Sequence, residues 1–120
     1  MASRRVVITG TGLVTPLGTG VAKTWTNICN GVSGVGRLTR FDPTGDPVQI
    51  AAEVKDFSAE DHFDKKAAKQ LKLFVQYALV SSRMALEESG FEINEDNCGR
   101  VGVITGNGMG GLPTITEQHE

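Results

Sequence analysis

The chain has 120 residues, of which 39% are apolar and 22% charged, and its formal net charge is -2 at pH 7. These values are typical of an ordinary soluble domain. They give no reason to expect nucleic acid as a partner, because nucleic-acid binding requires a basic excess. No apolar run approaches the roughly 20 residues of a membrane span, and the start of the chain lacks the apolar core of a secretion signal. The two cysteines have no CxxC spacing, which favours a reduced, cytoplasmic setting.

The first half of the chain predicts a strand, a helix and a second strand. A short β-branched run at 6–8 is followed by a glycine- and proline-containing loop that ends near Thr19, an acceptable helix N-cap. The next apolar residues lie at helical spacing and predict one face of a short amphipathic helix: Val21, Trp25, Ile28 and Cys29. Residues 31–45 predict an irregular connection. Apolar residues at every second position over 48–54 then predict a strand with one solvent-exposed face, at a sheet edge or in a hairpin arm.

A long helix is expected in the second half. Residues 58–61 resemble a helix start, with a hydroxyl cap and acids in the first turn, and either they open one helix or a second start follows near Asp64. The longest helix is predicted from about Lys66 to Ser89. Its middle, 73–80, is apolar on nearly every side, which predicts burial between layers.

Two nearly identical turns then suggest a candidate site. Residues 103–108 repeat residues 7–12 with a single change, and both pair a β-branched run with closely spaced glycines. We expect two neighbouring parallel strands, the second at 101–105, whose glycine loops open on one face. Ligands bind at that end of strands in open α/β sheets. The alternative is that the glycines serve only tight turns and close packing.

The loop at 106–111 also satisfies GxGxxG, the dinucleotide-binding pattern. Two features weaken that interpretation. Pro113, which suits the first turn of a new helix, stands where the phosphate-binding helix should already be running, and the chain ends before the acidic residue expected about 20 positions later. A nucleotide-binding α/β domain is therefore a minor alternative.

Few residues suggest catalysis or metal binding. Cys29 is expected to be a buried, inert thiol, and Cys98 has no base within local reach. His62 is expected to be solvated and His119 lies in a polar tail, so no metal-ligand spacing exists. The lysines at 65, 66, 69 and 72 are consistent with either a solvated helix face or a basic patch suited to an acidic partner.

One family shares these features. The stretch Arg5–Gly18 resembles the N-terminal signature of β-ketoacyl-acyl carrier protein synthases, and within that family it is similar to the elongating type, synthase II, of bacterial fatty-acid synthesis. The resemblance extends over essentially all 120 residues. Further matching segments are 41–42, 54–57, 74–78, 88–90 and 106–111.

The resemblance implies a thiolase-like layered α/β fold, in which two similar halves stack around central helices, usually as a homodimer. A full synthase is several times longer than this chain, so residues 1–120 are expected to be its N-terminal segment, incomplete by itself. Such enzymes perform a decarboxylative Claisen condensation of an acyl chain with malonyl-acyl carrier protein, in the cytoplasm. They use a cysteine and two histidines, and backbone amides that stabilise the developing oxyanion.

Only part of the family's machinery carries over to this chain. Its cysteine and histidine motifs lie downstream, so no catalytic residue, metal or cofactor is assigned. Gly108 and Met109 match the loop and apolar gate at the acyl pocket, where a flexible thioether can adapt to a moving chain. Lys65, Lys66 and Lys69 match the basic patch that docks acyl carrier protein, although Gln70 stands where a basic residue is common. A non-catalytic carrier-docking module is the other alternative.

Overall fold

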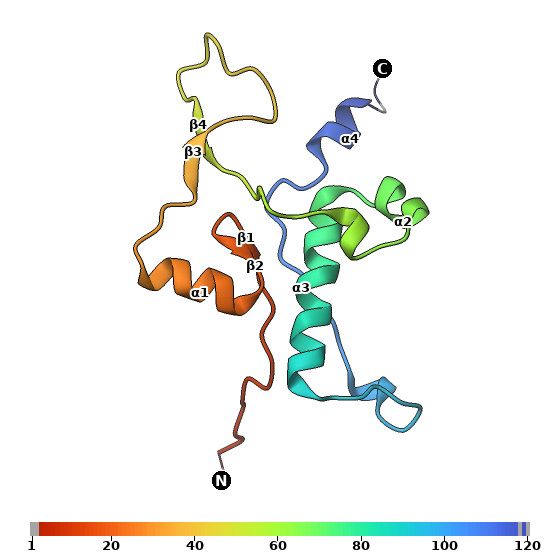
Figure 1. The fold of residues 1–120 in the computed structure, drawn as a ribbon. Helices are drawn as coiled ribbons and strands as arrows, with labels where there is room; N and C mark the ends of the chain where they lie inside the picture. Colours follow the sequence, from red (N-terminus) through yellow and green to blue (C-terminus); the bar gives the residue numbers. More distant parts are fainter. Residues whose placement is uncertain (1–2, 118, 120) are drawn as a thin grey trace.

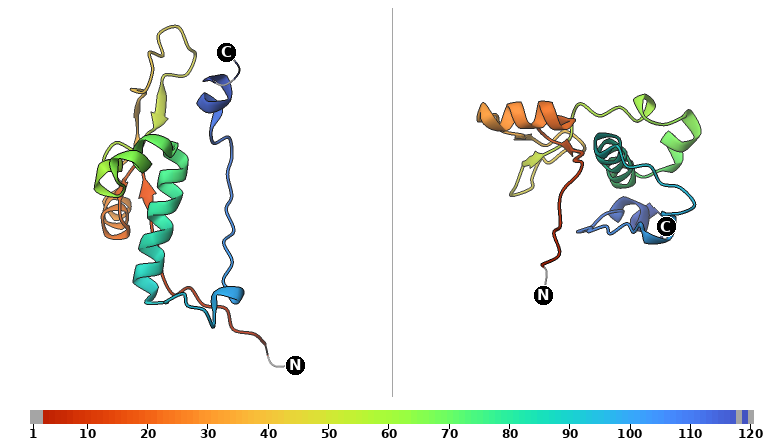
Figure 2. Two further views of the ribbon diagram at one scale, coloured as in Figure 1. Left: turned by 90° about the vertical axis from the view of Figure 1, so that its right-hand side faces the viewer. Right: turned by 90° about the horizontal axis from the view of Figure 1, so that it is seen from below.

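The computed structural model describes residues 3–117 and 119, and it consists of short elements joined by long extended segments (Figure 1). The elements in chain order are β1 (Val14–Thr15), β2 (Gly18–Thr19), α1 (Val21–Cys29), β3 (Val35–Arg37), β4 (Ile50–Ala52), the 3-10 turn η1 (Ala59–Asp61), α2 (Lys65–Gln70), α3 (Leu73–Ser89), the 3-10 turn η2 (Cys98–Arg100) and α4 (Leu112–Glu117). Helix α3 is the longest of them; α2 lies near its N-terminal end, and the extended segment between η2 and α4 runs along its length (Figure 2).

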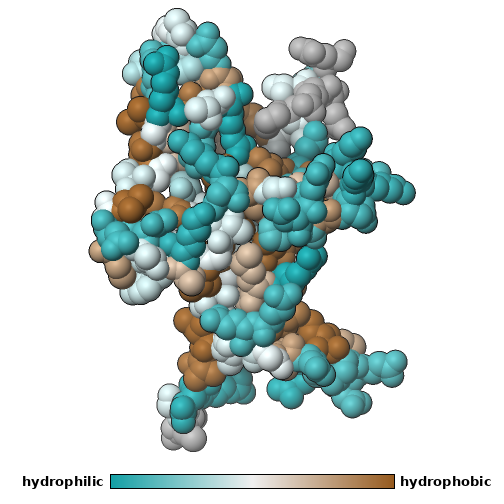
Figure 3. Space-filling model, viewed as in Figure 1, coloured by the Kyte–Doolittle hydropathy of each residue, from teal (hydrophilic) through white to brown (hydrophobic). Residues whose placement is uncertain are grey.

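The described residues do not close a core. Their radius of gyration is 17.9 Å, whereas a compact domain of this length has about 14 Å. Within this part of the chain Val80 is the single buried hydrophobic residue, at 2% exposure. Apolar side chains are open on the visible face instead of gathered beneath polar ones (Figure 3). The layers that a sheet and an apolar helix require are therefore not completed by these residues.

The two predicted glycine-ended strands are extended but unpaired. Ile8 is 86% exposed and Ile104 is 100% exposed, and among the described residues the sheets are two antiparallel pairs, β1 with β2 and β3 with β4. The prediction of parallel neighbouring strands at 6–8 and 101–105 is therefore wrong for this structure. A strand is stabilised by its hydrogen-bonding partners and by covered faces, and neither run has them here.

The hairpin prediction is confirmed in part. Strand β4 lies inside the predicted 48–54 strand and pairs antiparallel with β3, with Gly36 opposite Ala51. Its partner β3 falls within 31–45, which was expected to be irregular. The second hairpin, β1 with β2, was not predicted, because each of its strands has only two residues.

Helix α1 forms where expected but faces the other way. Trp25 on the predicted inner face is 63% exposed, whereas Thr24 is 3% exposed. The Thr24 hydroxyl donates to the Gly18 carbonyl at 3.0 Å, so a polar contact anchors the helix to β2. Gly20, not Thr19, is the N-cap, and the Thr19 hydroxyl donates to Asp56 at 3.3 Å.

The predicted long helix is interrupted. The second start near Asp64 is the correct alternative, since the Asp64 carboxylate accepts from the Lys66 and Ala67 amides at 2.9 and 2.8 Å. The chain then leaves helical geometry at Leu71 (ψ 127°) and Lys72 (ψ 152°), which separates α2 from α3. Gly90 ends α3 in the left-handed conformation, as predicted. All-round burial of α3 is not observed, because Phe74 is 40% and Leu79 44% exposed.

Candidate functional site

The three lysines matched to a docking patch share the outer face of α2. Lys65, Lys66 and Lys69 are exposed, while Ala67 and Ala68 are half-buried on the inner side. This is the distribution that a period of 3.6 residues gives to a surface helix. Gln70 is also exposed, so it interrupts the basic face without covering it.

No carboxylate neutralises these lysines. Over residues 3–117 and 119, the ion pairs are Lys23–Asp56 at 2.6 Å and Arg40–Glu53 at 4.0 Å, both remote in sequence from α2. The three ammonium groups therefore present an unpaired positive surface to solvent, whose field extends about a Debye length, roughly 8–10 Å at moderate salt.

The second glycine loop rests on the N-terminal half of α3. Residues Thr105–Asn107 line a cavity of ≈ 270 Å³ together with Phe74, Val75 and Ala78. At the other end of the loop, Gly111 has φ 85°, and a Cβ placed there would lie 3.5 Å from the Phe74 ring. Helix α4 begins at the next residue, as predicted.

The two residues matched to the acyl pocket lie between these anchor points. Gly108 is exposed, and Met109 is 81% exposed and does not line the Phe74 cavity. The Gly110 amide donates to the Asn107 side chain at 3.1 Å, which makes a local turn around them. A role for Met109 as an acyl gate stays a prediction.

The first glycine loop packs directly on the backbone of α3. A Cβ at Gly10 would lie 2.0 Å from the Ala85 carbonyl oxygen, and one at Gly12 would lie 1.9 Å from that of Ser81. Between them the Thr11 amide and hydroxyl both donate to one carboxylate oxygen of Glu88. Close packing, the alternative offered for the glycines, therefore explains this copy of the motif.

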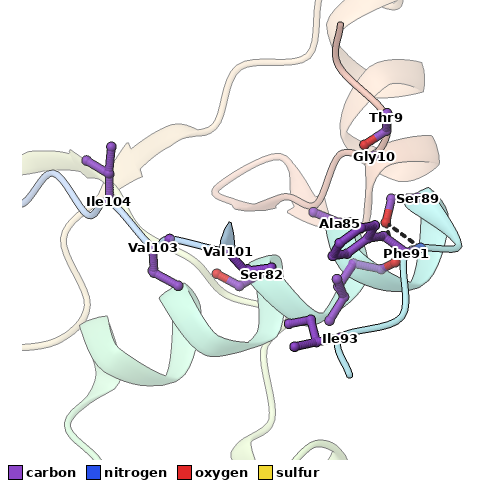
Figure 4. Close-up of a pocket in the computed structure, with 12 residues that line it drawn as sticks. Thr9, Gly10, Ser82, Ala85, Ser89, Phe91, Ile93, Val101, Val103 and Ile104 are labelled. Carbon is purple, nitrogen blue, oxygen red and sulfur yellow. Dashed lines mark hydrogen bonds between the residues drawn. The ribbon is translucent and has the colours of Figure 1, made fainter. Parts of the chain in front are cut away.

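A groove beside α3 is lined by the start of the first glycine loop and by most of the second predicted strand. It has a volume of ≈ 440 Å³ and is lined by Thr9 and Gly10, by Val101–Ile104, and by α3 residues that include Ser82 and Ala85 (Figure 4). At the edge of the groove, the Phe91 amide donates to the Ser89 hydroxyl at 3.0 Å. No side chain that would act as an acid or base lines the groove, and its polar side chains are the hydroxyls of Thr9, Ser82 and Ser89.

Three carboxylates with a lowered pKa tie loops to helices or to the hairpin. The Thr39 hydroxyl, helped by the amides of Thr39 and Arg40, lowers the pKa of Glu53, although burial opposes this. Bonding from Lys23, and then from Thr19, lowers the pKa of Asp56. The Thr11 hydroxyl and amide lower the pKa of Glu88. Each shift arises from structural hydrogen bonds, so these groups act as anchors.

The cysteines and histidines do not form a centre. Cys29 is exposed, so the prediction of a buried thiol is wrong, because α1 turns its apolar face outward. Cys98 is exposed as well. His62 is half-buried and stacks on Phe57 with ring centroids 5.2 Å apart, so it is not fully solvated as expected.

No group of three or more His, Cys, Asp or Glu side chains is arranged to hold a metal ion within residues 3–117 and 119. Across the same residues, none of the helices combines the length and apolarity that crossing a membrane requires.

Residues 3–120 match the family model described as the β-ketoacyl synthase N-terminal domain. The chain belongs to this family. A curated ketosynthase of Coxiella burnetii, 3-oxoacyl-(acyl-carrier-protein) synthase 2, is 49% identical over 120 residues, which are 100% of this chain and 29% of that protein. The protein of the same name in Staphylococcus aureus (strain COL) is 42% identical over 118 residues, 98% of this chain and 28% of that protein.

A solved ketosynthase supports the same fold. The ishigamide ketosynthase/chain length factor superposes with a TM-score of 0.62 at 35% identity and covers 80% of this chain and 23% of that chain. The thiolase-like α/β assignment is thereby confirmed. The chain spans less than a third of the length of the curated relatives it matches. Membership of the β-ketoacyl synthase N-terminal domain family argues against the minor nucleotide-binding alternative.

Sequence reasoning missed Gln76, which is 4% exposed and bonds to α2. A signal existed, because it is the one polar, non-aromatic side chain in the apolar run 73–80. The roles of Glu53 and Glu88 left no such signal, since an isolated glutamate in a polar stretch is ordinarily a solvated surface residue.

Proposed function

We propose that this chain is the N-terminal part of a 3-oxoacyl-acyl carrier protein synthase, which elongates fatty acyl chains by decarboxylative Claisen condensation. The proposal is supported by the family match over residues 3–120 and by two relatives whose names state that activity. In this reaction a cysteine thiolate takes the acyl group from its carrier, malonyl-carrier loses carbon dioxide, and the resulting carbanion attacks the acyl thioester and expels the thiolate. The cysteine and both histidines belong to sequence outside residues 1–120.

The contribution of this chain is to receive the carrier protein. The observation that carries this role is the outer face of α2, where Lys65, Lys66 and Lys69 are exposed and form no ion pair within the described ranges. An acidic helix of acyl carrier protein is complementary to such a face. Complementary charges accelerate encounter and fix the orientation of docking.

The second contribution is to the acyl pocket. Gly108 and Met109 lie in a loop whose two ends both meet Phe74 on α3. An unbranched thioether between glycines can change rotamer as an acyl chain passes. We further propose that the enzyme is a cytoplasmic homodimer, in keeping with the family that the chain resembles.

The docking role is tested by charge reversal in the full-length synthase. Lys66→Glu and Lys69→Glu, singly and together, should raise KM for the acyl-carrier substrate, by about tenfold for the pair, while kcat changes little. The dependence of kcat/KM on salt should become flatter, because screening then removes less attraction.

Lys55→Glu is the matched control. Lys55 is also an exposed lysine, but it follows β4 and lies beside Pro16 and Asp56, away from α2. The same charge change there should leave KM for the carrier within about twofold of wild type, since isolated surface charges contribute little. An equal effect of Lys55→Glu and Lys66→Glu, or none from either, would remove the docking role.

A further inference from the structure

Gln76 is the most completely buried polar residue of α3, and its hydrogen bonds leave that helix. It is 4% exposed in the first turn of α3. Its side-chain nitrogen Nε2 donates to the Ala68 carbonyl at 3.0 Å and to the Leu71 carbonyl at 2.8 Å. Ala68 lies in the last turn of α2 and Leu71 is its C-cap, so one amide group joins the two helices.

These acceptors are groups that α2 cannot satisfy itself. The last carbonyls of any helix have no partner within it. In α2 the Leu71 amide still reaches Ala67, but the backbone becomes extended at Leu71 and Lys72. The Ala68 carbonyl therefore loses the amide that a continuing helix would have supplied, and Gln76 replaces it.

Helix α2 depends on such external support. It has six residues, fewer than the roughly 12–15 that an isolated helix needs in water. At its N-terminus the Asp64 carboxylate caps the Lys66 and Ala67 amides. At its C-terminus the side chain of Gln76 ties it to α3. The outer face of α2 with Lys65, Lys66 and Lys69, called the lysine face below, lies between these two fixed ends.

We propose that Gln76 is a positioning residue for carrier docking: by capping the C-terminal carbonyls of α2, it fixes the angle at which the lysine face is presented. This inference rests on the docking role of α2 proposed above. Gln76 does not touch the carrier, and its effect passes entirely through the orientation of Lys66 and Lys69.

The burial of Gln76 argues against a role in stability alone. Its carbonyl oxygen Oε1 is buried and has no hydrogen-bond partner among residues 3–117 and 119. An orphaned buried acceptor costs desolvation free energy that an apolar side chain of similar shape would not incur. Methionine would remove that cost but would leave the Ala68 and Leu71 carbonyls without the Nε2 donor, so the two donated bonds, and the helix geometry they define, are what the amide supplies.

The first turn of α3 contacts the second glycine loop as well as α2. Phe74 and Val75, in the same turn of α3, line the cavity that holds Thr105–Asn107 of the glycine loop. Gln76, on another side of that turn, holds α2. The first turn of α3 therefore sets the position of the lysine face relative to the loop that contains Gly108 and Met109.

The test is Gln76→Met in the full-length synthase, compared with Gln49→Met, an exposed glutamine on the β3–β4 connection. If α2 keeps the docking orientation for only about one-fifth of the time, KM for the acyl-carrier substrate rises about fivefold. The value of kcat should stay within about twofold, and Gln49→Met should change neither by more than that, since it alters a solvated side chain.

A double-mutant cycle separates positioning from general destabilisation. In a Lys65→Ala/Lys66→Ala/Lys69→Ala background, Gln76→Met should raise KM no further, because none of the three lysines remains for it to position. An undiminished fivefold effect in that background would overturn the inference, and so would an unchanged KM for Gln76→Met in the wild-type background. If lysine removal has no effect on KM, the docking role itself fails. Gln76→Asn, an amide too short to reach α2, serves if the methionine variant does not fold.

Discussion

Gly12→Ala is expected to separate the first glycine loop from α3. The added Cβ would lie 1.9 Å from the Ser81 carbonyl oxygen and 2.9 Å from the Ala85 amide nitrogen. Unbonded carbon and oxygen approach to about 3.3 Å, so the overlap with Ser81 exceeds 1 Å. The obstacle is the backbone of a regular helix, which cannot be relieved by a rotamer change. Gly12 has no positive φ, so the effect is steric and not conformational.

The magnitude follows from this overlap. Overpacked sites cost about 1–3 kcal/mol when side chains can adjust, and a rigid backbone obstacle places Gly12→Ala at or above the upper end. The shift required also pulls Thr11 away from the Glu88 carboxylate. At the length of the curated relatives, about 400 residues, a loss of about 3 kcal/mol lowers Tm by roughly 3–4 °C.

The assay is thermal unfolding of the full-length synthase, with Gly99→Ala as the matched control. A Cβ at Gly99 meets nothing within 4 Å, so its free energy of unfolding should change by no more than about 0.5 kcal/mol. Gly10→Ala, whose Cβ would lie 2.0 Å from the Ala85 carbonyl, should resemble Gly12→Ala. A Tm for Gly12→Ala within about 1 °C of wild type would refute the packing of this loop on α3.

Three smaller predictions concern the carboxylate anchors of the same protein. Thr11→Val removes one of two donors to Glu88, so it should lower Tm less than Gly12→Ala does. The folded pKa of Glu88 lies below its ordinary value of 4.5, so its contribution is present above that pH and is lost as pH falls through the lowered pKa. The difference in Tm between wild type and Glu88→Gln should accordingly become smaller as the pH is lowered through the pKa of Glu88. The Glu53 carboxylate accepts three hydrogen bonds, from the amide and hydroxyl of Thr39 and from the amide of Arg40. Glu53→Gln replaces one of its two acceptor oxygens with an NH₂ donor. This substitution should speed hydrogen exchange at the Thr39 and Arg40 amides, and unchanged exchange rates would contradict the prediction.

Features set by local chemistry were predictable from the sequence. The aspartate at 64 could cap a helix, the glycine at 90 could end one, and alternation at 48–54 could place a hairpin arm. All three are present in the structure. Each depends on a side chain and the backbone a few residues away, which is the range over which sequence patterns act.

Features that depend on distant partners were not predictable. Nothing at 71–72 resembles a helix breaker, yet α2 and α3 separate there, where Gln76 bonds back to α2. The inward face of α1 is fixed by a threonine hydroxyl reaching β2, which outweighs the apolar spacing. The β-branched runs at 6–8 and 101–105 predict strands, but neither run forms one here, because a strand exists only when another chain segment pairs with it.

The two predicted sites come from the resemblance to the family, which does not predict a connection between them. The lysine face and the Gly108–Met109 loop are separated by some 40 positions in the sequence, and no spacing rule relates them. In the structure both are held by the first turn of α3, one through Gln76 and the other through Phe74. Because adjacent residues of a helix point in directions about 100° apart, a single turn can hold two surfaces at a fixed angle. A carrier protein seated on the lysines would thus have a defined position relative to the glycine loop, even though the described residues bury little apolar surface of their own.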